Sequence, residues 1–537
     1  MKRVLIVICF IQVFLTFKII VAVPFFASPP APGVKVDKIP KDGVHKLPDV
    51  SYLRAMGTPA SEIAKAIGTT GTKTLVVIFV NFSGTTFGGE EIASYTTLST
   101  GYLDRLKAYI TEISYGTLTL IITVKDNSGA GYSLSNSMLY YGSNNEAKTA
   151  DGTLFNDALV AAGVNGGYDA VMVVHAGTGQ ESEDVNSNIW SMFVDWGSLK
   201  RGFREGTTVP AKELGSLKPY GVLCHEFGHQ LGLPDLYNTD TGSSNVGKWD
   251  LMDYGAWVNN GDSPPHPSTW CKAFLSWVSP TLVNKASDLN INYFEGNSPS
   301  TFKIPILGSS TEYFLIEYRK QTGFDTNLPG QGVLIWHIDD TVGDIALNNI
   351  NNDSNHLRVA LKEADMDKDA GSNKGEGTDT YPTGSNIFTN PYSNGYSNIS
   401  SSITIFDFSG LGSDTMTAKL SMISATTNLV LKNALNFPNP VKNVARTTIR
   451  VSFSRPFTTG NLKLYNLAGE LILDNSLTSS EFNTQASQDN SEWIYDYVWD
   501  LKNSNGSLVG SGLYFYVVTA EIGSEKQVKT GKLAIIR

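Results

Sequence analysis

The sequence predicts an α+β domain in the first half of the chain, then a β-sandwich portion, then a second β-sandwich at the C-terminus. Between residues 75 and 175, apolar runs of buried-strand type alternate with helical patterns. From Leu289 onward, short alternating runs are separated by turn residues, which is typical of sheets packed face to face. With 537 residues, the chain is long enough for two to four domains, each with its own core.

The N-terminus has the pattern of a secretory signal. The charged start MKR precedes an apolar run, and small residues such as Ala22 and Ala27 follow. Residues 1–23 are therefore predicted to be a signal peptide, the alternative being an uncleaved membrane anchor. Residues 24–72, rich in Pro, Lys, Gly and Val, are predicted to be a pro-segment, the alternative being a linker. We expect a secreted protein without a membrane span after signal removal.

Charge and cysteine content narrow the classes of function. The formal net charge of −10 leaves no basic surface to neutralise phosphates, so no nucleic-acid partner is expected. Of the three cysteines, Cys9 lies in the predicted signal. Cys224 and Cys271 leave two alternatives, one disulfide or a small buried thiol at Cys224.

Residues 73–285 are predicted to form the first domain. Leu75–Phe82 is a continuous apolar run that indicates a buried strand, and Tyr102–Tyr115 has apolar residues at helical spacing. His175 is predicted to be structural, and His266, between two prolines, to be exposed. The remaining elements are predicted as strands over residues 117–124 and 170–175 and helices over residues 155–162 and 267–277.

The strongest chemical signal is the stretch VLCHEFGHQLGLPDLY. His225 and His229 are four residues apart, so a helix places both imidazoles on one face, where they can share a Zn²⁺ ion. Glu226 can hydrogen-bond a water on that metal without being a ligand. Gly232 lets the helix end and the chain turn back, so that Asp235 supplies a third ligand. A chance motif on a surface helix is the alternative.

The extended motif resembles the metzincin clan in its aspartate-ligand version. With LPDLY it is similar to the M6 peptidases, the family of the immune inhibitor A proteases. The runs YITEISYGTLTL, YDAVMVVHAGTGQES and GFDTNLPGQGVLIWHIDD resemble M6 sequences in wording and order. The resemblance implies a metzincin-like α+β catalytic domain with a Met-turn at Met252, a hydrophobic support under the ligands. It also implies a catalytic hydrogen bond from Tyr254 to the developing oxyanion, with plain packing as the alternative.

The predicted function is hydrolysis of protein substrates by a secreted zinc metalloendopeptidase. Zinc-activated water would attack the peptide bond, with Glu226 as general base and then as general acid. Two rival functions stay open: a catalytically silent surface-binding protein or adhesin on a protease fold, and a zinc hydrolase of non-protein amides. The presence of Glu226 argues against the first, because metal binding alone needs no base.

Residues 286–422 are predicted to continue the peptidase region with short strands, among them EYFLIEYR and GVLIWHID. In this part, the loop Asp365–Asp369 carries a carboxylate at every second position, with Asn373 and Glu376 further on. Ala370 stands where the sharp turn of an EF-hand requires glycine, so an EF-hand is not expected. A structural Ca²⁺ site and a solvated acidic loop are the two alternatives.

Residues 423–537 consist of short strands with turn signals, which favours an immunoglobulin-like β-sandwich. The runs LNFPNP, NLKLYNLAGELIL and SGLYFYVV resemble two kinds of C-terminal module, the FlgD-like immunoglobulin domains and the type IX secretion sorting domains. This resemblance implies export or attachment at the cell surface. The secretion or cell-surface machinery is then the expected partner of this module, which has no part in catalysis.

Overall fold

The structure is a computed structural model that describes most of the chain between residues 25 and 537. The described residues are 25–32, 34, 67–142, 147–183, 185, 187–296, 299–306, 309–366, 375–389, 391–396, 401–422, 430–454, 459–476, 482–486, 493–522 and 525–537. The predicted signal peptide lies outside them, as do much of the predicted pro-segment and residues 367–374 of the predicted calcium loop. In this described part, no helix has the length and apolar character needed to cross a membrane.

The first part of the chain is built on a mixed sheet. Among the described residues, seven strands form it in the order β1-β6-β7-β5-β2-β3, with β4 beside β2. Strands β3, β2, β5 and β7 are parallel, β6 is antiparallel to β7, and β1 is antiparallel to β6. The strands are β1 Phe25–Ala27, β2 Gly71–Asn81, β3 Leu118–Lys125, β4 Tyr132–Ser133, β5 Ala170–Thr178, β6 Met192–Lys200 and β7 Phe203–Lys212.

Helices cover both faces of this sheet, which explains why the run in β2 is continuously apolar. Leu75, Val77 and Phe79 pack into the core that holds α4 and α8. The alternate residues, Val76 and Ile78, pack on the opposite face against α7. The helices are α3 Glu91–Thr96, α4 Tyr102–Ile113, α5 Met138–Gly142, α6 Ala147–Ala150, α7 Thr153–Ala161, α8 Tyr220–Gln230 and α9 Thr269–Phe274. The predicted strands and helices of this domain are confirmed within a few residues.

The next part of the chain is strand-rich. A five-stranded sheet, β13-β12-β11-β10-β8, and a four-stranded sheet, β14-β15-β16-β9, enclose one core among the described residues. The strands are β8 Thr281–Leu282, β9 Ser287–Asn292, β10 Phe302–Pro305, β11 Glu312–Arg319, β12 Gly332–Asp339, β13 Val359–Leu361, β14 Ile387–Phe388, β15 Thr404–Ser409 and β16 Thr415–Ser421. This arrangement is compatible with the predicted β-sandwich portion.

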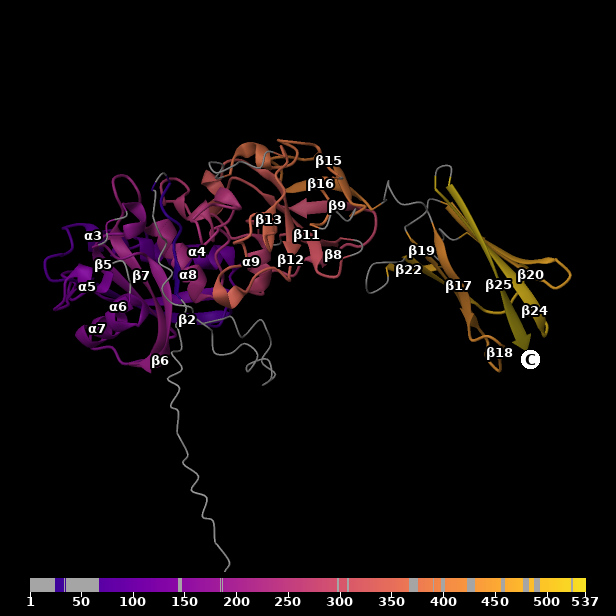
Figure 1. Ribbon diagram of the computed structural model, residues 1–537, viewed down its shortest axis with the longest axis horizontal. Coiled ribbons are helices and arrows are strands. Elements are labelled where there is room, and N and C mark those ends of the chain that lie inside the picture. Colours follow the sequence, from indigo (N-terminus) through magenta and orange to yellow (C-terminus); the bar gives the residue numbers. More distant parts are fainter. Residues whose placement is uncertain are drawn as a thin grey trace, which may run out of the picture.

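Strand β12 joins this part to the first domain. Its residues Val333 and Ile335 face the core of the two sheets. Leu334, Trp336 and Ile338 face the other way and belong to the same core as α4 and α8. In Figure 1, α9 accordingly lies between α8 and the strands β11 and β12. The two parts of the chain therefore share one hydrophobic core.

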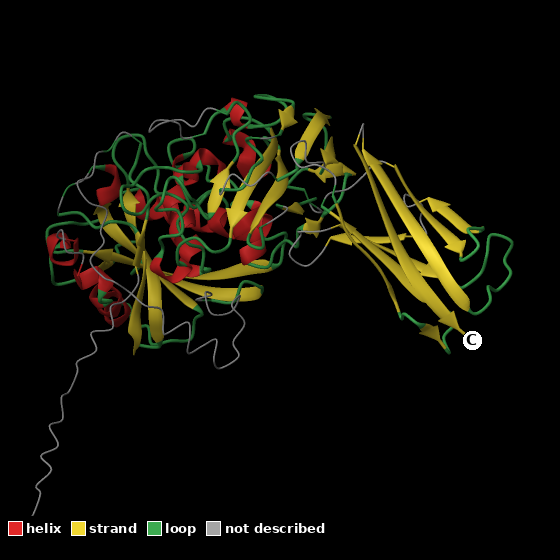
Figure 2. Ribbon diagram, turned by 45° about the vertical axis from the view of Figure 1, so that its right-hand side comes forward, coloured by secondary structure: helices red, strands yellow, loops and turns green. Residues whose placement is uncertain are grey.

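The C-terminal strands form two further sheets, β17-β19-β23-β22 and β18-β25-β24-β20-β21, around a core of their own in the described residues. In Figures 1 and 2 they stand apart from the other sheets. The strands are β17 Leu431–Phe437, β18 Val441–Lys442, β19 Thr447–Phe453, β20 Thr459–Asn466, β21 Leu471–Ser476, β22 Phe482–Ala486, β23 Trp493–Trp499, β24 Gly512–Ile522 and β25 Glu525–Ile536.

Candidate active site

The predicted motif lies on α8, which is buried along its whole length. Glycine at two places allows the helix to pack this closely and to end where it does. Gly221 lies so close to the backbone oxygen of Ala256 that a Cβ atom there would be 1.9 Å from it. Gly232 has φ +101°, a conformation that favours glycine, and it ends the helix with its amide donating to the His229 carbonyl at 2.8 Å.

The three predicted metal ligands converge, His225 and His229 from α8 and Asp235 from the turn that follows it. The Nε2 atoms of His225 and His229 are 3.1 Å apart. Asp235 Oδ1 lies 3.0 Å from Nε2 of His225 and 3.3 Å from Nε2 of His229. All three side chains are fully shielded from solvent. The structure therefore brings together the ligand set that the sequence predicts.

The donor chemistry of the three atoms fits a cation. Each imidazole directs Nδ1 at a backbone carbonyl, His225 at Leu251 (2.9 Å) and His229 at Leu233 (2.7 Å). With the protons on Nδ1, both Nε2 atoms present lone pairs to each other and to Asp235 Oδ1, so three acceptors face one another without a donor. A tetrahedral zinc at about 2.0–2.1 Å from each ligand would separate the ligand atoms by about 3.3 Å. The observed spacing matches this value.

Electrostatics support the same assignment. Burial lowers the pKa of His229, which keeps its imidazole neutral as metal coordination requires. Burial acts to raise the pKa of Asp235, but His229 and His225 outweigh it and lower that pKa to about 2. Asp235 is thus a carboxylate, and its Oδ1 has no hydrogen-bond partner among the described residues.

Glu226 lies beside the two imidazoles, with one carboxylate oxygen within 4.8 Å of a nitrogen of each. Neither of its oxygens has a hydrogen-bond partner in the described part of the chain. Burial, then the charges of Asp235 and Glu181, raises its pKa well above the usual range. A buried carboxyl with a raised pKa is suited to accept and return a proton.

The turn around Met252, which follows the motif, packs against α8. Met252 is fully buried, and its sulfur lies 2.7 Å from where a Cβ atom on Gly228 would be. The Asp250 carboxylate holds this turn by accepting from the Met252 amide at 2.7 Å and from the Ser268 amide at 2.7 Å. Because the carbonyl of Leu251 accepts from His225, the turn also sets the orientation of one imidazole.

Tyr254, the predicted oxyanion donor, is buried. The hydroxyl donates to the Gly242 carbonyl at 3.3 Å. Tyr254 lines a cavity of about 620 Å³ together with Pro32, Trp257 and Glu376.

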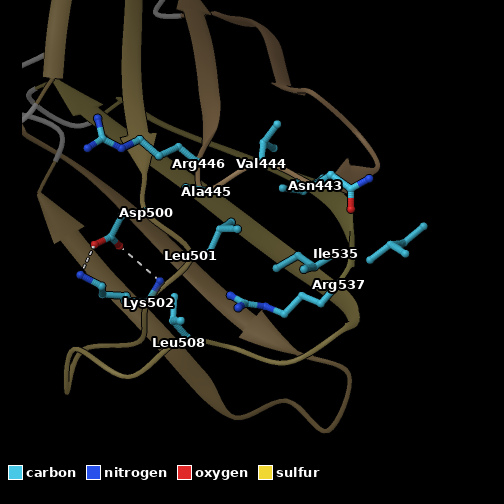
Figure 3. A pocket seen from close by; sticks show the side chains of 12 residues that line it. Asn443, Val444, Ala445, Arg446, Asp500, Leu501, Lys502, Leu508, Ile535 and Arg537 are labelled. Atoms are coloured by element: carbon cyan, nitrogen blue, oxygen red, sulfur yellow. Dashed lines mark hydrogen bonds and ion pairs between the residues drawn. The ribbon is translucent and has the colours of Figure 1, made fainter.

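A different cavity, of about 500 Å³, lies in the C-terminal module (Figure 3), where Arg446, Lys502 and Arg537 are among the lining residues.

An N-terminal stretch, residues 25–32 and 34, lies across the site, and we call it the covering segment. Strand β1 pairs antiparallel with the sheet edge β6, with Ala27 opposite Met192. Next along the chain, the Ser28 amide donates to the Ser191 carbonyl at 3.1 Å, and backbone groups of Ser28 and Phe193 lie near enough to Glu226 to affect its pKa. No local signal in the sequence predicts this pairing.

The covering segment is held on both sides of α8. On the β6 side, the Trp190 indole donates to the Ser28 carbonyl at 2.9 Å. On the other side, the Trp257 indole donates to the Pro29 carbonyl at 3.0 Å, and Ala31 packs with Val222 on α8. The covering segment therefore lies against α8 and close to Glu226.

Two further expectations are decided by burial. Cys224 and Cys271 are free and buried thiols, so they do not form a disulfide. His266 is fully buried, which shows that the predicted exposure is wrong. Its Nε2 lies 3.0 Å from the Glu112 carboxylate and its Nδ1 lies 2.7 Å from Lys272 Nζ, two partners that the local sequence does not indicate.

A second group of carboxylates lies outside the site. Glu363, Asp365 and Asp379 bring ligand oxygens within 4.8 Å of one another. Asp379 is fully buried and accepts from the Trp249 indole at 2.6 Å. Burial first, then Asp365 and Glu376, raises the pKa of Asp379 to about 6, although its hydrogen bonds oppose the shift. Only Asp365 belongs to the predicted calcium loop.

Two imidazoles and a glutamate on a buried helix, with the Asp235 carboxylate just beyond its end, form a donor set that could hold a metal ion. Residues 160–278 match the family model for the immune inhibitor A peptidase M6, catalytic domain. This part of the chain is similar to the M6 peptidases, a family of metallopeptidases.

Two curated relatives match over 131 residues at 34% identity. One is the pre-pro-metalloprotease PrtV of Vibrio cholerae serotype O1, with 21% of this chain and 14% of that protein covered. The other is immune inhibitor A of Bacillus thuringiensis subsp. alesti, with 21% and 19% covered. The chain thus spans less than a fifth of the length of these relatives. PorZ, a surface component of the type-IX secretion system of Porphyromonas gingivalis, is 17% identical over 25% of this chain and 15% of that one, with a TM-score of 0.16, too weak to support any conclusion.

Proposed function

We propose that the protein is a secreted zinc-dependent endopeptidase with a metzincin-like catalytic domain. The observation that supports this most strongly is the meeting of three buried acceptor atoms, from His225, His229 and Asp235, beside the buried carboxyl of Glu226. Zinc bound by these atoms would supply the Lewis acidity that activates water and polarises a peptide carbonyl.

The residues of the chain then have distinct tasks. Glu226 takes a proton from the attacking water on a carboxylate oxygen and later delivers it to the leaving amine nitrogen. The carbonyls of Leu251 and Leu233 keep both imidazoles in the tautomer that leaves Nε2 available. Tyr254 is proposed to donate a hydrogen bond to the developing oxyanion, which requires it to exchange its bond to Gly242 for one to substrate.

The proposal for residues 24–72 is a pro-segment that keeps the enzyme inactive. The covering segment supports it, since residues that pair with β6 and approach Glu226 leave no room for a substrate backbone at the same place. An extended peptide added to a sheet edge gains main-chain hydrogen bonds, so a substrate could use the same edge after the segment has left. Activation therefore requires release of this segment from β6.

The remaining parts of the proposal concern location and ions. The signal-like N-terminus and the C-terminal module support export or attachment at the cell surface, with secretion or surface machinery as partner and protein as substrate. The cluster of Glu363, Asp365 and Asp379 supports a structural Ca²⁺ ion in this part of the chain, because hard oxygen ligands of this kind suit calcium.

One experiment distinguishes this function from a silent binding protein and from a hydrolase of small amides. Wild type from which residues 1–66 have been removed, which keeps the whole of β2, is compared with the same truncated chain carrying Glu226→Gln or Glu91→Gln, the second being a matched change of a carboxyl on helix α3. Denatured casein and a small acyl amide are the substrates, with and without a zinc chelator. We expect casein cleavage by wild type and Glu91→Gln, loss with chelator, and a reduction of at least a hundredfold in Glu226→Gln.

Three results would contradict the proposal. Casein cleavage that survives both Glu226→Gln and the chelator would exclude this mechanism. Wild type that binds zinc but leaves casein intact would favour a binding protein, and cleavage of the amide alone would favour the small-amide hydrolase.

A further inference from the structure

Asn348 contacts the metal ligand Asp235 from the strand-rich part of the chain. It follows the short 3-10 helix η5, Ile345–Leu347, and is itself buried. Its side-chain oxygen accepts from the Asp235 amide at 2.7 Å, and its side-chain nitrogen donates to Asp235 Oδ2. One amide group therefore binds both the backbone and the carboxylate of the same ligand.

These two bonds decide which oxygen of Asp235 faces the imidazoles. Oδ2 is engaged by Asn348, whereas Oδ1 has no hydrogen-bond partner among the described residues and lies 3.0 Å from His225 Nε2. Without the amide, rotation of the carboxylate would carry Oδ1 away from the imidazoles, and the buried Oδ2 would lose its donor. Outer partners of this kind orient metal ligands in many proteins.

The conformation and chemistry of Asn348 suit this task. Its backbone is left-handed, with φ 51° and ψ 40°, a region in which asparagine is one of the few side chains that is tolerated. Its carbonyl accepts from the Thr239 hydroxyl at 3.0 Å, which ties the turn to the loop that follows Asp235. A neutral amide also leaves the negative charge of Asp235 available to a cation, whereas a lysine or arginine would compete with the metal.

We propose that Asn348 is a positioning residue that sets the metal affinity of the site by fixing the Asp235 carboxylate. The inference rests on the proposed function, because it assumes that His225, His229 and Asp235 bind zinc. It adds that the ligand set is incomplete without a residue from the strand-rich part. Neither the family match, which ends at residue 278, nor the motif includes Asn348.

Zinc affinity of the metal-stripped full-length chain is measured by competition with a chromophoric chelator, independently of any peptidase activity. Asn348→Gly removes the amide and keeps the left-handed backbone accessible. Asn352→Gly is the matched control, because Asn352 accepts from the Thr239 amide at 3.0 Å and so holds the same loop without touching Asp235. We expect a zinc affinity about 10–100-fold weaker in Asn348→Gly and unchanged in Asn352→Gly.

Asn348→Ala is the second variant, to be used if Asn348→Gly does not fold as judged by its melting temperature. It also removes the amide that holds Asp235 Oδ2, and it restricts the backbone more than glycine does, so zinc binding should weaken as well. Wild-type affinity in the folded variants, or equal weakening in Asn348→Gly and Asn352→Gly, would overturn the inference while leaving the proposed function intact. Failure of wild type to bind zinc would overturn the proposed function itself.

Discussion

Replacing Gly221 by alanine tests how closely α8 is packed against the turn that follows the motif. Alanine normally stabilises a helix relative to glycine by about 0.5–1 kcal/mol, so a purely local argument predicts a more stable protein. The structure predicts the opposite. A Cβ atom at this position would lie 1.9 Å from the Ala256 carbonyl oxygen and 3.2 Å from the Gly261 oxygen, both of them backbone atoms.

The magnitude follows from these distances. A carbon–oxygen contact needs about 3.3 Å, so α8 and the turn at Ala256 must separate by roughly 1.4 Å. That movement disrupts the buried hydrogen bond from the Gly221 amide to the Gly261 carbonyl, now 2.7 Å long, which costs about 1 kcal/mol. Overpacking adds about 1–3 kcal/mol. After subtraction of the helix preference, we expect a net loss of about 2 kcal/mol.

Thermal unfolding of the full-length chain is the assay. A loss of about 2 kcal/mol corresponds to a fall of about 4–8 °C in Tm for a domain of this size. Gly228→Ala is a graded comparison, because its nearest atom is the sulfur of Met252, the end of a flexible side chain that can turn away. Gly89→Ala, with nothing within 4 Å, is the neutral control. A Tm for Gly221→Ala at or above wild type would refute the packing argument.

Three further predictions address pH, the covering segment and calcium. Burial lowers the pKa of His175 to about 4, so its neutral form contributes fully above pH 6.5, and stability should fall by up to about 3 kcal/mol as pH drops from 6.5 to 4. Urea midpoints in His175→Gln should fall less over that range, and an unchanged slope would exclude His175 as the cause. A synthetic peptide of residues 25–34 should inhibit casein cleavage by the processed enzyme competitively, raising KM without changing kcat, whereas inhibition by a scrambled peptide of equal strength would argue against specific pairing with β6. Calcium at a hundred times its Kd should raise the Tm of wild type by several degrees, which corresponds to about 2.7 kcal/mol. That rise should be absent in Asp379→Asn and present in Asp414→Asn, an exposed aspartate on another loop, and equal rises in both would place the ion elsewhere.

The parts of the site that follow from local chemistry could be predicted from the sequence. The spacing of His225 and His229 fixes a shared face as soon as the segment is helical, and Gly232 fixes the place where the chain turns back toward the imidazoles. The continuous apolar run in β2 likewise indicates a strand buried on both faces. Each of these statements depends on residues only a few positions apart.

The parts that depend on distant segments could not be predicted in this way. Asn348 is 113 positions from Asp235, and nothing in the run ALNNINND indicates which asparagine meets a carboxylate. His266 has the local signs of an exposed loop, yet its amide donates to Asp325 at 2.8 Å, in a segment that covers it. The pairing of β1 with β6 could not be predicted for the same reason. Many short apolar stretches can add to a sheet edge, and the sequence does not indicate which of them does so.

The position of Asn348 has a consequence for biosynthesis. During translation, both imidazoles, the base and Asp235 are made well before the residue that anchors the Asp235 carboxylate. The nascent chain therefore carries an unfinished site until η5 has been made and β12 has closed the core around α8. On the proposed function, sequence order alone delays completion of the metal site to a late stage of folding. A shortened chain that ends before residue 348 would lack this anchor, however well α8 itself is formed.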